Sequence, residues 1–161
     1  MRPRVIALLL SLIVALFLTL VPMTEGFNYW RPLWMPMTVM YWCLHFPARL
    51  GIIFSLVVGL VLDAFLGFYL GQTAMAMSVV AFGCLVFSRR WQHITVFQQV
   101  AAIAPMLLVY QFISGWLFQW TGGNLQFTDW LWPIIPSVLI WPIFQLILIR
   151  ATFNHWMEKL S

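Results

Sequence analysis

Long apolar runs between widely spaced charges are the feature that most constrains how this chain can fold. Of 161 residues, 63% are hydrophobic and 7% are charged, with eight Lys or Arg and four Asp or Glu. A soluble domain carries about 25% charged residues, which give its core a solvated surface. Because the runs are close to the roughly 20 residues that span a bilayer, the sequence predicts an all-α membrane protein and excludes a soluble enzyme or binding module.

Six apolar segments predict six transmembrane helices in a single integral membrane domain that covers residues 1–161. Each segment is bounded by a charge, a proline or a glycine. The first is longer than the core of a signal peptide and is followed by no small-x-small cleavage site, so we expect it to be retained. The segments are 5–21, 33–46, 51–66, 72–87, 98–118 and 131–149.

The basic residues predict a cytoplasmic location for both termini, because Lys and Arg are retained on the cytoplasmic side of short loops. With six spans, seven basic residues lie inside and only Arg31 lies outside. Five spans would move Arg49 or the Arg89-Arg90 pair to the outer face. We therefore expect a multi-pass membrane protein with both termini in the cytoplasm. The seven inner residues are Arg2, Arg4, Arg49, Arg89, Arg90, Arg150 and Lys159.

Tryptophans are expected at both membrane interfaces, where an apolar ring and a polar N–H are both accommodated. Trp141 is the exception in mid-span, and the adjacent Pro142 predicts a kink unless neighbours compensate. The outer set is Trp30, Trp34, Trp120, Trp130 and Trp132, and the inner set is Trp42, Trp91 and Trp156.

A stripe of small residues at four-residue intervals predicts close packing by the third segment. Asp63 is the one acidic member of this stripe and lies inside an apolar run, where a carboxylate needs a partner, a water cavity or a raised pKa. Two interpretations remain open: Asp63 caps the outer end of the third segment or the entry to the fourth through backbone N–H groups near Gly67, or it belongs to a partner interface or a polar cavity. The stripe comprises Gly51, Ser55, Gly59, Asp63, Gly67 and Gly71.

The first outer loop contains an arginine on the side that the insertion bias disfavours. Arg31 lies between Trp30 and Trp34, whose rings could stack on its guanidinium or cover its stem. Either this loop is an interfacial anchor, with Pro32 opening the second helix, or Arg31 forms a fixed ion pair for which Asp63 is the candidate partner.

Two cytoplasmic segments, 91–99 and 153–160, show amphipathic helical spacing. They are either membrane-anchored helix ends or a docking surface for a cytoplasmic partner. The candidate docking residues are Arg89, Arg90, Trp91 and Trp156.

Catalytic and ligand-binding motifs are not evident in the sequence. It contains no Gly-x-Ser-x-Gly elbow, no phosphate-binding glycine loop and no basic patch for nucleic acid. The spacing brings no His, Cys or carboxylate groups together as metal ligands, and Cys43 and Cys84 are expected to be small buried hydrophobic residues. We therefore expect a protein that is not an enzyme, with no cofactor, no metal and no nucleic-acid partner.

The order and spacing of several motifs resemble the MreD family of rod shape-determining membrane proteins. The similarity extends over the whole chain in length and span order, and it is densest over residues 31–78. The motifs are Arg31-Pro32-x-Trp34, Tyr41-Trp42, Pro47-x-Arg49, Gly59-x3-Asp63-x3-Gly67-x2-Leu70-Gly71-x2-Ala74 and Trp141-Pro142.

This resemblance implies a non-enzymatic scaffold of the machinery that synthesises peptidoglycan during cell elongation. The implied partners are MreC, the MreB filament, RodA and its transpeptidase partner, besides membrane lipids. The implied fold is similar to the six-helix substrate-binding subunit of energy-coupling-factor vitamin transporters, and a small-molecule-binding transport subunit is the alternative function. The residues implied for partner binding or for the fold are Arg31, Trp34, Asp63, Gly67 and Gly71, with Gly51, Ser55 and Gly59 for helix packing.

Overall fold

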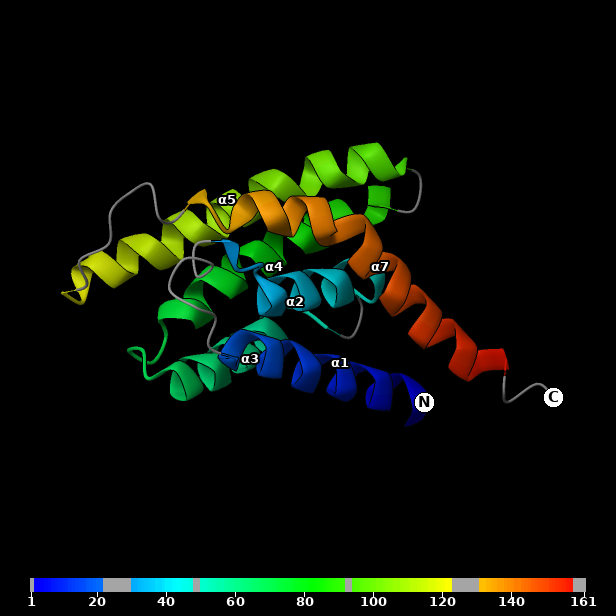
Figure 1. The fold of residues 1–161 in the computed structure, drawn as a ribbon, viewed down its shortest axis with the longest axis horizontal. Coiled ribbons are helices and arrows are strands. Elements are labelled where there is room, and N and C mark those ends of the chain that lie inside the picture. Colours follow the sequence, from blue (N-terminus) through cyan, green and yellow to red (C-terminus); the bar gives the residue numbers. More distant parts are fainter. Residues whose placement is uncertain (1, 22–29, 48–49, 92–93, 123–130, 158–161) are drawn as a thin grey trace.

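The described part of the chain is a bundle of six helices. In this computed structural model, residues 2–21, 30–47, 50–91, 94–122 and 131–157 are described. Helix α1 begins on the same side of the bundle on which α7 ends (Figure 1). The helices are α1 (Arg2–Leu20), α2 (Trp34–His45), α3 (Ile52–Leu66), α4 (Gln72–Trp91), α5 (Val96–Trp120) and α7 (Ile134–Met157).

Each predicted apolar segment overlaps one of these helices over most of its length, so the prediction of six helices is confirmed. Two helical stretches, Gln72–Trp91 and Phe97–Trp120, are long and apolar enough to cross a membrane. Three others are shorter apolar helices, namely Val5–Leu20, Ile52–Leu66 and Ile134–Arg150.

Helix α2 occupies the middle of the bundle, between α1, α4 and α7 (Figure 1). Every residue from Met35 to Leu44 is buried. A helix that is apolar on all sides is typical of such a central position. At 12 residues, α2 is about 18 Å long, well short of the bilayer core.

Helices α3 and α4 form the most closely packed pair, as the stripe of small residues predicts. A Cβ atom on Gly59 would lie 2.4 Å from the Cα of Ala74 and 2.8 Å from its nitrogen. The backbones of α3 and α4 therefore approach each other at a point where only glycine fits. Gly67 ends α3 in the left-handed conformation with φ of 69°, which favours glycine because it has no Cβ.

The connection between α4 and α5 differs from the prediction. The sequence predicts one amphipathic segment over residues 91–99, whereas α4 continues to Trp91 and a new helix begins at Val96. Thr95 and Gln98 cap α5 reciprocally, with both bonds of a capping box present. Trp91 is 2% exposed and Phe97 is 83% exposed, so the two residues do not share a face.

Helix α7 is longer than the predicted span of 131–149, because it continues without interruption to Met157. Pro142 lies inside it, and Figure 1 shows that α7 bends along its length. Trp141 is fully buried in mid-helix. The backbone of the predicted segment 153–160 is helical as far as Met157, but its side chains, including that of Trp156, lie outside the described part of the structure.

The contact between Gly59 and Ala74 predicts that Gly59→Ala destabilises the bundle, by about 1–3 kcal/mol as for other overpacked sites. Gly83→Ala is the matched control, because it is also a glycine-to-alanine change within a helix but a Cβ there would meet nothing within 4 Å. Thermal unfolding in mild detergent, followed by circular dichroism, checks both variants. Equal melting temperatures for the two would contradict close packing at Gly59.

Candidate functional site

The carboxylate of Asp63, near the end of α3, is fully buried and binds the first turn of α4. Its Oδ2 accepts hydrogen bonds from the backbone N–H groups of Gly71 at 3.0 Å and Ala74 at 3.3 Å. The N–H of Thr73 donates to both carboxylate oxygens, at 3.0 Å and 3.1 Å. One side chain therefore satisfies three backbone donors that have no partner within their own helix.

Gly71 explains why the cap comes from another helix. Its carbonyl accepts the first helical hydrogen bond of α4, from the N–H of Met75 at 2.9 Å, so Gly71 occupies the N-cap position. Glycine has no side chain to cap the helix, and Asp63 supplies the missing oxygen atoms. Its negative charge also lies at the positive end of the α4 dipole.

This geometry places Asp63 in the capping arrangement that the sequence left as one of two interpretations. The capped helix end is that of α4, and the donors are Gly71, Thr73 and Ala74 rather than groups adjacent to Gly67. Gly67 and Gly71 contribute through their backbones, because both have positive φ and a Cβ on either would meet nothing within 4 Å. The stripe therefore divides into packing positions within α3 and turn positions after it.

Further polar groups surround the cap where α5 packs against α4. The Tyr110 hydroxyl interacts with the side chains of Thr73 and Ser114. The side-chain amide of Gln72 donates to the Ser114 carbonyl at 3.3 Å, and the Gln72 Oε1 atom is buried without a hydrogen-bond partner. A buried polar cluster thus joins α3, α4 and α5.

Arg31 does not pair with Asp63, so of the two interpretations of the first outer loop the ion pair is wrong. Its Nη2 atom donates to the carbonyl of Leu18, near the end of α1, at 3.2 Å. Asp63 has no need of a cation, because the N–H groups of α4 already neutralise it locally. Partial burial lowers the pKa of Arg31 from its ordinary value, but an arginine remains charged at neutral pH.

The start of α2 is joined to α7 by two contacts. The backbone N–H of Leu33 donates to the Ser137 hydroxyl at 2.8 Å. The ring of Trp34 lies 6.1 Å from that of Phe144. Arg31 and Trp34 therefore link α1, α2 and α7, which supports their importance for the fold.

Two tryptophans expected at the inner interface lie inside the bundle instead. Trp91 packs edge-on against Trp141 at 6.3 Å. The indole N–H of Trp42 donates to the Ser11 hydroxyl at 2.9 Å. Packing between helices that are distant in sequence outweighs the interfacial preference of these rings.

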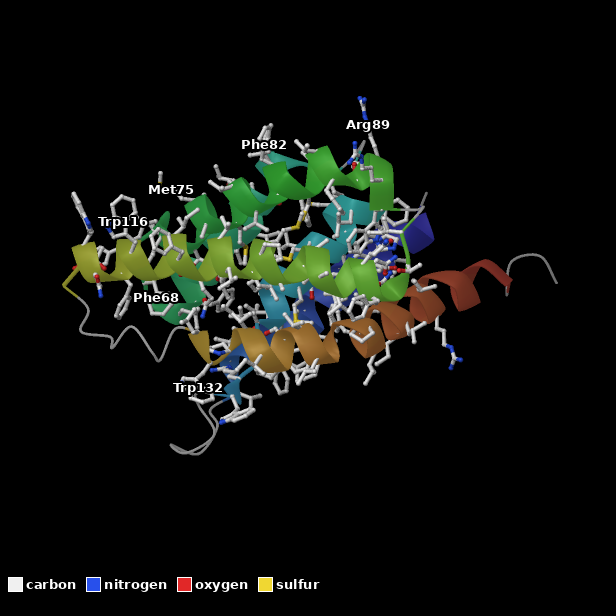
Figure 2. The ribbon with its side chains drawn as sticks, turned by 90° about the horizontal axis from the view of Figure 1, so that it is seen from above. Phe68, Met75, Phe82, Arg89, Trp116 and Trp132 are labelled. Carbon is white, nitrogen blue, oxygen red and sulfur yellow. The ribbon has the colours of Figure 1, made fainter. Side chains whose placement is uncertain are left out.

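The two ends of the bundle differ in chemistry. Figure 2 shows Phe68, Trp116 and Trp132 at one end and Arg89 at the opposite end. Arg89 and Arg90 are exposed, as a docking surface requires, whereas Trp91 is buried and contributes no exposed surface. The candidate docking set therefore reduces to the two arginines among the described side chains.

No group of three or more His, Cys, Asp or Glu in the described part of the chain could hold a metal ion. Cys43 and Cys84 are free and buried, as the sequence predicts.

The cap predicts a graded loss of stability at Asp63. Asp63→Ala leaves three backbone donors without an acceptor in an apolar setting and should cost about 2 kcal/mol or more, and Asp63→Asn, which keeps one acceptor oxygen, should cost less. Unfolding titrations in mild detergent measure both. Glu25→Gln, which removes a carboxylate outside α3 and α4, serves as the control. An Asp63→Ala variant as stable as this control would contradict the cap.

Comparison with known proteins gives a consistent family relationship. The family model described as rod shape-determining protein MreD matches residues 2–151. Over 66 residues, the chain is 35% identical to the rod shape-determining protein MreD of Haemophilus influenzae, a match that covers 41% of each chain. The alignment thus spans about two fifths of the length of this relative. No solved structure matches the chain. Since the family model covers nearly the whole sequence, the chain belongs to the MreD family of rod shape-determining proteins.

Proposed function

We propose that this protein is a non-enzymatic, multi-pass scaffold in the bacterial cytoplasmic membrane, which binds MreC and connects it to MreB filaments and to RodA with its transpeptidase partner. Family membership is the observation that carries a role in maintaining rod shape. The proposed scaffold crosses the membrane six times, and its bundle is similar to the substrate-binding subunits of energy-coupling-factor transporters.

Outward apolar side chains support a membrane location for the bundle. On α4, Met75, Val79, Phe82 and Val86 are all exposed, with two of them at the positions labelled in Figure 2. A soluble protein seldom exposes such a continuous apolar stripe, whereas a helix facing lipid gains from it. The cap formed by Asp63 is consistent with a membrane location, because backbone N–H donors in the lipid core must find their acceptors within the protein.

The two ends support one orientation in the membrane. Aromatic side chains gather at the end that carries Trp116, and Arg89 lies at the other (Figure 2). Aromatic rings suit an interface, and arginines are retained on the cytoplasmic side. The start of α1 and the end of α7 lie on the same side of the bundle, which fits the proposed location of both termini in the cytoplasm (Figure 1).

Cysteine labelling tests this orientation. Trp120→Cys, at an exposed site in the last turn of α5, should react with an impermeant maleimide in intact spheroplasts. Arg89→Cys should react only after the membrane is permeabilised. The unsubstituted protein is the control, because its two buried cysteines should label slowly. The reverse pattern would overturn the proposed orientation.

Capture from native membranes tests the scaffold itself. The full chain, purified in mild detergent after brief crosslinking, should carry MreC in a stoichiometric amount, with RodA in the larger complex. A tagged, unrelated multi-pass protein expressed at the same level is the control. Depletion of the chain should turn rods into rounded cells. Normal rods after complete depletion, or capture of a vitamin and an ATP-binding-cassette module in place of MreC, would refute the scaffold.

A further inference from the structure

A groove of about 310 Å³ runs between α1 and α7 and reaches Trp42 of α2. Several of its wall residues, including Ile6, Leu10 and Ile147, are exposed, so the groove is open along its length. It forms no part of the Asp63 cap or of the contact between α3 and α4. Its walls include Ile6, Leu10, Val14, Trp42, Phe144 and Ile147.

The polar groups in the groove are already satisfied. The Ser11 hydroxyl accepts a hydrogen bond from the indole N–H of Trp42 at 2.9 Å and donates to the carbonyl of Leu8 at 2.8 Å. The remaining lining side chains are hydrocarbon. A vitamin or another polar metabolite would find no hydrogen-bond partner among these lining groups. A hydrocarbon chain forms no hydrogen bonds with water and therefore loses none when it enters the groove.

The dimensions of the groove fit a single acyl chain better than a helix of a partner protein. The α1 wall extends from Ile6 to Leu18, which corresponds to about 18 Å at the helical rise of 1.5 Å per residue. A helix of that length and of about 10 Å diameter occupies about 1,400 Å³. The groove volume of about 310 Å³ holds about ten methylene groups, if each fills roughly the 30 Å³ of a water molecule.

Positive charge lies at one end of this groove. Arg150 is exposed and follows the wall residue Leu148 by two positions on α7. Arg2 and Arg4 belong to the first turn of α1, which precedes the wall residue Ile6. Neither α1 nor α7 contains an acidic residue. The apolar walls therefore lead to the exposed side chain of Arg150 and to the positive end of the α1 dipole, which are complementary to an anionic headgroup.

We propose that the groove between α1 and α7 binds one acyl chain of an anionic phospholipid, whose phosphate lies beside Arg150 and the first turn of α1. The inference rests on the membrane location in the proposed function, because the lipid must reach the groove from the bilayer. It goes beyond that function by assigning a specific lipid site to this pair of helices.

Native mass spectrometry of the full chain in mild detergent tests the headgroup contact. Phosphatidylglycerol should be retained in preference to phosphatidylcholine with the same acyl chains. Arg150→Gln should weaken phosphatidylglycerol binding about fivefold, the effect of one arginine near an anionic lipid. Arg90→Gln, an equally conservative change of an exposed arginine on α4, should leave it unchanged. Equal retention of the two lipids overturns the proposal.

A second pair of variants tests the acyl-chain contact. Ala7→Phe places a ring in the groove, since Ala7 is one of its lining residues, and should abolish retention. Ala64→Phe adds the same ring at an exposed position on α3 and should have no effect. Circular dichroism verifies that both variants retain their helices. If Ala7→Phe does not fold, the Arg150→Gln comparison decides alone.

Crosslinking in native membranes distinguishes a lipid from a partner helix. A photoreactive residue in place of Ile147 should form adducts with phospholipid, and a stoichiometric protein adduct would overturn the lipid assignment. This result is independent of the scaffold proposal. If the chain captures MreC but binds both lipids equally, only the lipid site is refuted. If the chain binds the anionic lipid selectively but does not capture MreC, only the scaffold is refuted.

Discussion

The carboxylate of Asp63 is the interaction on which the rest of the bundle depends. It accepts hydrogen bonds from the N–H groups of Gly71, Thr73 and Ala74 and so fixes the start of α4 against the end of α3. The same register brings Gly59 against Ala74, where the backbones approach most closely. Because α4 contacts α2 and α5 as well as α3, its position determines how the central helix and the polar cluster around Tyr110 are placed.

Around this fixed pair, the molecule separates its polar and apolar chemistry. Among the described residues, polar groups inside the bundle include the cluster near Asp63 and the bonded pair of Trp42 and Ser11, whereas the Nε1 atoms of Trp91 and Trp141 have no hydrogen-bond partner. Apolar side chains cover the outward surfaces of the helices, including α4. This outer surface differs from that of a soluble domain, and it supports the proposed membrane setting, in which helix faces contact lipid or other membrane helices.

Local patterns predicted the fold better than they predicted the contacts. Apolar runs located six helices, and the spacing of Gly59 and Asp63 located the packing face, because these signals are periodic within one segment. The ion pair of Arg31 was wrong because its acceptor, the Leu18 carbonyl, is a backbone atom that no motif marks. The start of α5 could have been found from Thr95-x-x-Gln98, a capping box. The groove between α1 and α7 joins opposite ends of the sequence, so no local pattern encodes it.

The cap on α4 also bears on how the chain enters the membrane. All its donors follow Asp63 by only eight to eleven residues, so the cap is complete once α3 and the first turn of α4 have emerged. In hydrocarbon, α3 alone would carry a carboxylate without donors, and α4 alone would carry unpaired N–H groups, each at a cost of several kcal/mol. In the proposed membrane setting, each helix removes the other's barrier to insertion, and we expect the two to enter the bilayer as one hairpin rather than as two independent segments.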